Sequence, residues 1–410
     1  MTQAHVIGAG LAGLSAAIRL TEAGFRVTLS EAAGQAGGRC RSYRDPQLGM
    51  EIDNGNHLVL SGNRAVNAYL ATIGASARLS GPEEARFPFV DLRDGTRWTL
   101  RPNAGRLPWW ILSSARRVPD TKAGDYLAFA KLAGAQRIGD IIPSHGVLWD
   151  RLIAPLMISA LNTPAADGSA GLAGAVVRET LAKGGHACMP RIAEPSLAAA
   201  FVEPALAWLE LHGADLRLGR RLRALESDGS RLTRLVFADG EAPVEGPVVL
   251  AVPGWVAADL LPGLTVPTEH HSILNAHFRI APPAHANAIV GVIGGTAEWI
   301  FAFPDRISTT TSAADALDGE DREMLARRIW DDVGRVHGLD LPMPAWQIVR
   351  EKRATFAATP EQDRRRPPAK TAFANLWLAG DWTQTGLPAT IEGAIRSGET
   401  AARLAREVLK

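Results

Sequence analysis

The sequence predicts an α/β protein of two domains, and this prediction rests on three observations. The chain has 410 residues, of which 46% are hydrophobic and 21% charged, so it is long enough for two sizeable cores. Residues 5–31 alternate strand and helix patterns, and residues 376–410 repeat a strand, a turn and a helix. The stretch 76–199 lacks this alternation, which favours a second domain of a different architecture.

The first element is a Rossmann-like βαβ unit. His5-Val6-Ile7 predicts a strand and "GAGLAG" at 8–13 a tight turn, while residues 11–23 predict a helix and "FRVTLSE" at 25–31 a second strand. A glycine-rich turn between a strand and a helix is typical of a nucleotide site.

Each glycine of the turn has its own task. Gly8 permits the turn, Gly10 lets a pyrophosphate approach the backbone, and Gly13 lets the helix pack closely on the strand. Leu11 and Ala12 begin the helix, where backbone N–H groups are free to bind an anion.

An acid and a second glycine turn follow the βαβ unit. Glu31 lies 18 residues after Gly13, where its carboxylate can accept hydrogen bonds from both hydroxyls of a ribose and would repel a 2′-phosphate. The ligand should therefore be NAD or FAD rather than NADP. Gly37-Gly38-Arg39 adds a second close-approach turn with a guanidinium that can fork onto a phosphate.

The closing element favours FAD. Leu376 to Ala379 predicts a short buried strand, and a helix is predicted from Ile391 to the end of the chain. Gly380 allows a close approach, and Asp381 can accept hydrogen bonds from ribityl or ribose hydroxyls. The helix start at Thr390 and Ile391 can face the electron-rich edge of a flavin. The last element then closes a site that the first one begins.

These motifs resemble those of the FAD-dependent amine oxidase and phytoene desaturase superfamily. Within it, the chain most resembles the squalene-associated hydroxysqualene dehydroxylases of hopanoid biosynthesis. The resemblance covers nearly the whole chain, through "DNGNHLVLSG" at 53–62, "LPWWILSSARRVP" at 107–119, "FVEPALAWLELHGADLRLG" at 201–219, "VVLAVPGWVAADLLPGL" at 248–264 and "LAGDWTQTGLPATIEGAIRSGE" at 378–399.

The resemblance implies a discontinuous arrangement of the two domains. The FAD-binding domain, of the glutathione reductase and amine oxidase type, would comprise residues 1–75, 200–265 and 370–410. A substrate and membrane-facing domain of mixed sheet and helices would comprise residues 76–199, largely helical, and 266–369. The resemblance also implies that the backbone near Leu222 contacts the adenine.

The activity implied by the resemblance is the reductive removal of the hydroxyl of hydroxysqualene, with hydride from reduced FAD, to give squalene. Hydroxide is a poor leaving group, so a proton donor is expected at the alcohol. Asp53 and His57 are the candidates, because "IDNGNHL" at 52–58 passes close to the flavin in this fold, with Asn54 and Gly55 at the cofactor. Asn54-Gly55 is equally explained as a two-residue hairpin turn.

Other functions stay open at this point. An oxidative flavoenzyme, a carotenoid-type desaturase or an amine oxidase, would use the same cofactor site, and an isoprenoid carrier without flavin can share the fold. Leu387-Pro388 stands where amine oxidases often place an aromatic residue, which argues against amine oxidation. Trp382 could line the pocket or pack in the core. Arg364-Arg365-Arg366 is most simply a solvated loop.

Composition bounds the partners. With 44 Lys and Arg against 43 Asp and Glu, no overall field favours nucleic acid. Cys40 and Cys188 are the only cysteines, and no His, Asp or Glu cluster has metal spacing, so we expect no metal and a reducing, cytoplasmic compartment. No second dinucleotide motif appears, so an external electron donor or reductase is expected. A spanning helix is not expected because the chain lacks an apolar run of about 18 residues.

The segment "LPWWILSSARRVP" at 107–119 suggests a peripheral contact with the cytoplasmic membrane. Its tryptophans precede Arg116 and Arg117, a pairing typical of a segment that enters the interface while its cations meet lipid phosphates. The alternative is an ordinary core segment that ends in two solvated arginines.

Overall fold

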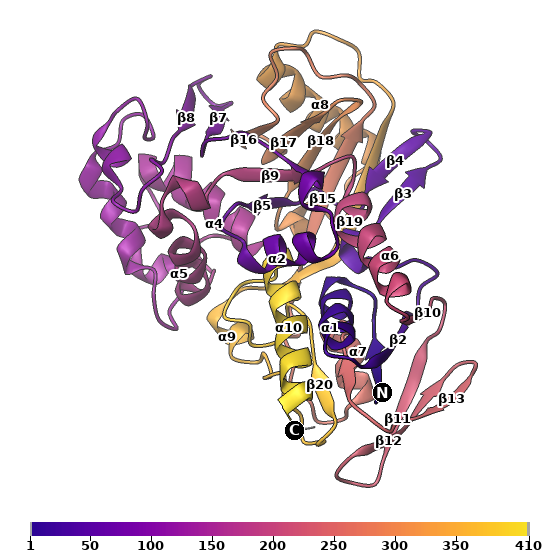
Figure 1. Cartoon of the computed structure of the whole chain (residues 1–410). Helices are drawn as coiled ribbons and strands as arrows, with labels where there is room; N and C mark the ends of the chain where they lie inside the picture. The colour runs from indigo at the N-terminus through magenta and orange to yellow at the C-terminus, as the bar shows by residue number, and fades with distance from the viewer. Residues whose placement is uncertain (1, 408–410) are drawn as a thin grey trace.

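A computed structural model describes residues 2–407 of the chain. A five-stranded parallel sheet, in the lower part of Figure 1, has the strand order β10-β2-β1-β14-β20. The strands are β1 (Gln3–Ile7), β2 (Arg26–Ser30), β10 (Asp215–Arg217), β14 (Val248–Leu250) and β20 (Leu376–Leu378). The three segments assigned from sequence to the FAD-binding domain therefore supply one sheet, although the exact domain limits stay predictions.

Both faces of this sheet are covered, as expected for a parallel sheet. On one face lie helices α1 (Leu11–Glu22) and α10 (Ile391–Glu407), which pack on Val6, Leu29 and Val249. The opposite face is covered by a three-stranded antiparallel sheet of β11 (Leu222–Ser227), β12 (Leu232–Phe237) and β13 (Gly240–Pro243). The predicted first βαβ unit and the closing strand and helix are confirmed.

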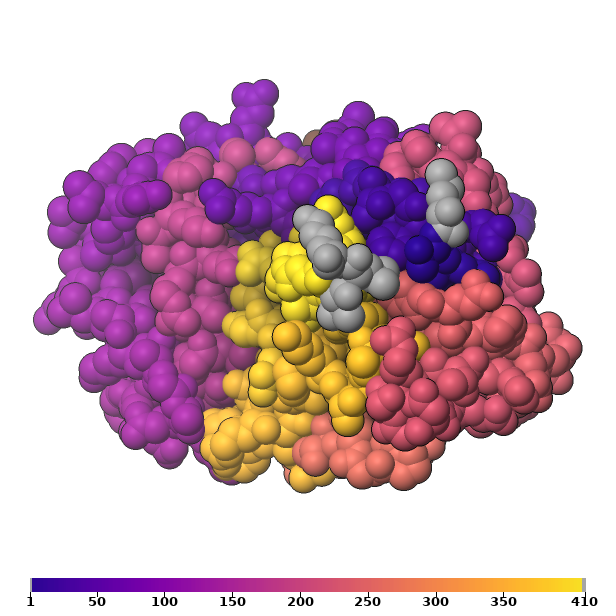
Figure 2. Space-filling model, turned by 60° about the horizontal axis from the view of Figure 1, so that its bottom comes forward, coloured from indigo at the N-terminus to yellow at the C-terminus, as the bar shows by residue number. Residues whose placement is uncertain are grey.

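Two glycines allow the helices to come close to their neighbours. A Cβ on Gly13 would lie 1.8 Å from the carbonyl oxygen of Gly8, and one on Gly398 would lie 2.1 Å from that of Ala12. Gly398 therefore lets α10 pack directly on α1. Figure 2 shows the result, with the last helix lying against the indigo N-terminal segment although the two are at opposite ends of the chain.

A second sheet has seven strands in the order β19-β15-β18-β17-β16-β7-β8. Its pairs are antiparallel except β16 with β7. The strands are β7 (Phe87–Asp91), β8 (Arg97–Leu100), β15 (His270–Phe278), β16 (Ile289–Ile293), β17 (Trp299–Phe303), β18 (Arg306–Thr311) and β19 (Trp346–Phe356). Helix α8 (Arg322–His337) covers one face.

The stretch 76–199 is less helical than the sequence predicts. Its α-helices are α3 (Ile138–Ile141), α4 (Ala154–Leu161) and α5 (Ala170–Glu179), while the predicted helix in "KAGDYLAFAKLAG" is the 3₁₀ helix η4 (Ala123–Lys131). This stretch also supplies β7 and β8 to the large sheet. Strand β7 pairs with its neighbour β8 in a hairpin and with β16 from the distant residues 289–293, so no local pattern in 76–199 signals how the hairpin joins the large sheet.

The remaining elements are short. They are β3 (Ser42–Asp45), β4 (Met50–Asp53), β5 (Leu58–Leu60), α2 (Arg64–Thr72), β6 (Leu79–Ser80), η3 (Trp109–Leu112), β9 (Pro190–Ala193), α6 (Glu203–Leu211), α7 (Gly254–Leu260) and α9 (Pro360–Asp363). Across residues 2–407, no helix combines the length and the apolar character that crossing a membrane requires.

Candidate flavin site

The two predicted glycine turns meet at the start of α1. Gly37 pairs with Gly10 as an isolated β-bridge, and its N–H donates to the carbonyl of Ala9 at 2.8 Å. Gly37 has a φ of 107°, which favours glycine, and Gly38 approaches Gly10 so closely that a Cβ would lie 3.4 Å from its Cα. The sequence placed these turns in one site, and the structure brings them together.

Open space adjoins this meeting point. A Cβ added to Gly10 would find no atom within 4 Å, and Gly10, the N-cap of α1, makes no side-chain cap. Since glycine has no side chain, Gly10 cannot cap the amides of Leu11 and Ala12 in the first turn. An uncapped helix start beside open space fits a pyrophosphate.

Glu31 holds the same loop from the other side. Its Oε2 accepts the Ala9 N–H at 2.7 Å, and its Oε1 accepts the Ala33 N–H at 2.8 Å. Each carboxylate oxygen keeps a second lone pair, so the group can still accept ribose hydroxyls. The backbone N–H of Arg220 donates to the Glu31 carbonyl at 2.7 Å, which brings the start of β11 at Leu222 close to Glu31.

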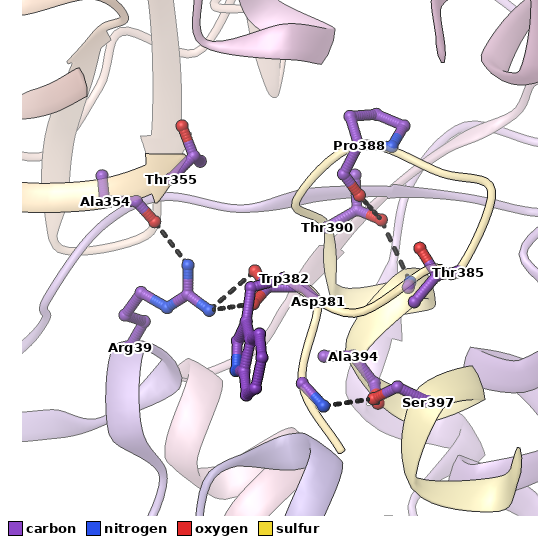
Figure 3. Close-up of polar contacts among 12 residues, drawn as sticks. Arg39, Ala354, Thr355, Asp381, Trp382, Thr385, Pro388, Thr390, Ala394 and Ser397 are labelled. Atoms are coloured by element: carbon purple, nitrogen blue, oxygen red, sulfur yellow. Dashed lines mark hydrogen bonds and ion pairs between the residues drawn. The ribbon is translucent and has the colours of Figure 1, made fainter. Parts of the chain in front are cut away.

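Arg39 meets Asp381 in a two-pronged ion pair (Figure 3). Its Nη2 donates to Oδ1 at 2.7 Å and to Oδ2 at 2.6 Å, and its Nη1 donates to the Ala354 carbonyl. Burial opposes the charge of Arg39, but the Asp381 carboxylate holds the pKa of Arg39 above its ordinary value. The pair joins the second glycine turn to the closing loop. Contact between Arg39 and a pyrophosphate stays a prediction.

The closing loop is tied down at both ends. The Gly380 N–H donates to Ser397 Oγ at 2.8 Å, and Thr390 Oγ1 accepts the Gly393 N–H at 3.0 Å (Figure 3). Thr390 therefore caps α10. The amides of Ile391 and Glu392 precede the first helical hydrogen bond and can face a ligand.

Glu392 has a role that the sequence analysis missed. Its carboxylate accepts the N–H groups of Ala65 at 3.1 Å and Val66 at 2.9 Å, so it caps the start of α2 across the site. Arg396, one turn later, pairs with Glu392 and with Glu179. The Glu-to-Arg spacing of four in "IEGAIR" was the signal that could have indicated this pair.

The prediction of a solvated loop at residues 364–366 is wrong for its last arginine. A solvated loop was expected for Arg364-Arg365-Arg366, but Arg366 is only 2% exposed, while the two preceding arginines are exposed.

Trp382 is a core residue rather than a pocket residue. Its Nε1 donates to the Val252 carbonyl at 2.9 Å, and its ring lies 3.2 Å from the position of a Cβ on Gly254.

The segment 53–58 is not a hairpin. Strand β4 before it pairs with β3, and β5 after it pairs with β9, so Asn54-Gly55 connects two different sheets. Gly55 lies against Asn275 of β15, with the Asn275 Nδ2 3.1 Å from the position of a Cβ on Gly55. The Asn54 side chain donates to Glu351 at 3.1 Å.

Asp53 is buried at the end of β4. Its Oδ1 accepts the Ser42 hydroxyl at 2.6 Å and the Leu197 N–H at 2.9 Å, and Arg306 lies 3.7 Å from Oδ2. Burial raises the pKa of Asp53, while these hydrogen bonds act in the opposite direction. The carboxyl group therefore anchors the start of the 53–58 segment.

His57 is half-buried and neutral at neutral pH. Burial, and secondly the charge of Arg39, lower the pKa of His57 to about 4. Because the charge of Arg39 acts on the His57 imidazole, His57 lies near the junction of the two glycine turns and the closing loop. Its environment differs from that of Asp53, because no hydrogen bond to the His57 ring is found among the described residues.

An aromatic face of the seven-stranded sheet begins next to this segment. Strand register puts Asn275 opposite Thr310, which in turn lies opposite Trp299, so all three share one face. Trp299 meets Phe89 edge-on, with ring centroids 5.5 Å apart, and Phe89 stacks on Trp98 at 5.4 Å. From Gly55, the face therefore changes from amide and hydroxyl groups to aromatic rings. Helix α4 lies beside it, because Ser159 Oγ accepts the Trp299 Nε1–H at 2.5 Å.

The parallel sheet with its glycine turns, the acid after β2 and the closing loop define an FAD-binding oxidoreductase fold. Residues 11–406 match the family model described as flavin containing amine oxidoreductase, so the chain belongs to this family. Cyclohexylamine oxidase from Brevibacterium oxydans has the same fold, with a TM-score of 0.72 at 14% identity and full coverage of both chains. The FAD predicted from the sequence is confirmed as the cofactor.

Relatives of much higher sequence identity are hydroxysqualene dehydroxylases. The hydroxysqualene dehydroxylase of Zymomonas mobilis is 52% identical over 99% of both chains. That of Rhodopseudomonas palustris is 54% identical over 98% of this chain and 97% of its own. The resemblance to hydroxysqualene dehydroxylases is confirmed. Among residues 2–407, no three His, Cys, Asp or Glu side chains gather as a metal site would require.

Proposed function

We propose that the protein is an FAD-dependent oxidoreductase that removes the hydroxyl of hydroxysqualene and gives squalene. Its main support is identity of 52% and more over nearly the whole length of relatives that bear this name. The chemistry that reduced FAD supplies is hydride transfer. The hydroxyl takes one proton and leaves as water, and the hydride replaces it on the same carbon.

The chain's own residues would divide this work along the sheet. The apolar chain of the substrate would lie along the aromatic face of Trp299, Phe89 and Trp98, beside α4. Aromatic faces tolerate a developing allylic cation, and one desolvated cation–π contact contributes about 2 kcal/mol. The hydroxyl would lie at the polar end, beside the 53–58 segment.

His57 is the better candidate for moving the proton. Asp53 already accepts two hydrogen bonds and lies beside Arg306, so its carboxyl is committed to holding the backbone. No hydrogen bond to the His57 ring is found within residues 2–407, and a pKa of about 4 makes its protonated form a strong acid that suits donation to a leaving hydroxyl. We assign His57 the proton transfer and Asp53 the positioning of its segment.

The 107–119 segment supports a membrane surface as the source of the substrate. Leu107, Trp109 and Leu112 are 81%, 50% and 72% exposed, whereas Trp110 is buried and packs edge-on against Tyr126 at 5.2 Å. The Arg116 guanidinium lies over the Trp109 ring at 4.7 Å. This combination suits entry into the interface of an anionic bilayer.

The two predicted arginines differ in this surface. Arg117 is committed to backbone carbonyls, those of Thr121 and Ile111, both at 2.9 Å. Within the described part of the chain, the Arg116 side chain makes only one long hydrogen bond, from Nη1 to the Arg101 carbonyl at 3.4 Å, so its other donors can meet a lipid phosphate, with about 1 kcal/mol expected from such a cation. An aqueous step is avoided when a water-insoluble triterpene enters directly from the bilayer.

An external electron donor or reductase completes the proposal, because the sequence holds a single dinucleotide motif. The test separates the reaction classes. Photoreduced protein with hydroxysqualene should yield squalene, whereas oxidised protein with an amine or a polyene hydrocarbon should leave its flavin oxidised. Reduction of the flavin by either of the latter, with no squalene from the former, would replace this function with an oxidative one.

A further inference from the structure

Arg366 stands out among the arginines near the closing loop because its whole side chain is buried. It follows α9 directly, and its side chain is 1% exposed. A buried charge is retained only where partners compensate for its lost hydration. The identity of those partners therefore indicates what the residue does.

Two of its three polar partners belong to the closing loop. Nη1 donates to Asp363 Oδ1 at 2.9 Å, within α9. Nη2 donates to Thr385 Oγ1 at 2.7 Å and to the backbone carbonyl of Asp381 at 3.1 Å. The guanidinium carbon also lies 4.9 Å from the centre of the Phe356 ring. A planar fork with fixed donor directions is needed for this set, which an ammonium could not reproduce.

The contact with Thr385 continues to the start of α10. Thr385 Oγ1 accepts the Leu387 N–H at 3.2 Å and donates to the Leu387 carbonyl at 3.1 Å. The next residue, Pro388, accepts the Thr390 hydroxyl at 3.3 Å, and Thr390 caps the helix (Figure 3). A chain of hydrogen bonds and peptide links thus runs from Arg366 to the first turn of α10.

Asp381 is held from two sides. Arg39 binds its carboxylate, and Arg366 binds its carbonyl. Burial lowers the pKa of Arg366, which the neighbouring Asp363 opposes. The Nε of Arg366 has no hydrogen-bond partner among the described residues, so the fork is turned toward the loop at the expense of one donor.

We infer that Arg366 is a positioning residue for the flavin, which fixes the loop 381–388 so that Asp381 and the amides that begin α10 meet the cofactor in register. A reduced flavin carries more negative charge than an oxidised one, so it gains more from these amides. Loss of Arg366 should then weaken FAD binding and weaken it most in the reduced state. The inference concerns FAD alone and does not depend on the proposed triterpene substrate.

The test compares four variants: Arg366→Met, Arg366→Lys, Thr385→Val and the control Arg364→Met, which changes an exposed arginine two residues away. The measurements are the dissociation constant of FAD from reconstituted apoprotein and the midpoint potential of the holoprotein. Arg366→Met should bind FAD about 10- to 100-fold more weakly. Each tenfold preference in that loss for the reduced state lowers the potential by about 30 mV.

Arg366→Lys should recover part of both quantities, and Arg364→Met should match the wild type. Should Arg366→Met fail to fold, Thr385→Val decides, because it removes the hydroxyl that links Arg366 to Leu387 and keeps the side-chain shape; it should shift affinity and potential in the same direction. Wild-type affinity and potential in a folded Arg366→Met or Thr385→Val protein would overturn the inference. A purely structural role would lower thermal stability and leave both quantities unchanged.

Discussion

Glu31 offers the sharpest test of the cofactor site. Its two oxygens already accept the Ala9 and Ala33 amides at 2.7 and 2.8 Å, and the ribose hydroxyls are expected on the remaining lone pairs. Glu31→Gln keeps the shape but replaces one acceptor with a donor, which must face one of these N–H groups. Hydrogen bonds to a charged group contribute about 1.5–3 kcal/mol, so we expect FAD to bind about 10- to 100-fold more weakly.

The assay is titration of apoprotein with FAD, followed by flavin fluorescence. Glu22→Gln is the matched control, because Glu22 is an exposed acid of α1 that pairs only with Arg19 among the described residues. Glu31→Ala should lose at least as much affinity as Glu31→Gln. A dissociation constant within about twofold of the wild type in both Glu31 variants would remove this residue from the ribose site.

Three further outcomes are expected. Substrate-driven reoxidation of the reduced flavin should slow at least about tenfold in His57→Ala and, since the pKa of His57 is about 4, should speed up in the wild type as the pH falls from about 7; equal rates would exclude His57. Burial lowers the pKa of His277 from 6.5 to about 3, so its stabilising contribution exists above 6.5 and is lost on acidification. In urea unfolding, the free energy of unfolding of the wild type should fall between about pH 7 and pH 5 by about 2 kcal/mol more than that of His277→Gln. Equal losses in the two proteins would contradict this. The double variant Trp109→Ala, Leu112→Ala should abolish cosedimentation with anionic liposomes at low salt. Leu211→Ala, at an exposed leucine of α6, should leave it unchanged. Wild-type binding by the double variant would show that the 107–119 segment does not contact the membrane.

Local patterns made the elements around the candidate cofactor site predictable. The glycines of 8–13 and the acid Glu31 act through backbone geometry over a single βαβ unit, so their spacing alone indicates the site. Gly380 and Thr390 were found in the same way, from a strand, a glycine and a helix start. The two glycine turns were predicted to lie together, and the pairing of Gly10 with Gly37 agrees with this prediction.

Long-range contacts explain what the sequence did not reveal. Glu392 caps α2 across more than 300 residues, and Arg366 is buried only because the loop around Thr385 folds over it. A run of three arginines looks the same whether or not its last member is covered. The hairpin of β7 and β8 was not predicted, and its place in the large sheet depends on the pairing of β7 with the distant β16.

A single turnover without oxygen distinguishes reductive removal of the hydroxyl from every oxidative function. Photoreduced holoprotein is mixed with one equivalent of hydroxysqualene, and flavin oxidation is followed by absorbance while squalene is measured by mass spectrometry. We expect one squalene for each flavin oxidised, with one deuterium incorporated when the protein is reduced in deuterated water. A flavin that stays reduced with no squalene formed, or squalene formed without flavin oxidation, would contradict it.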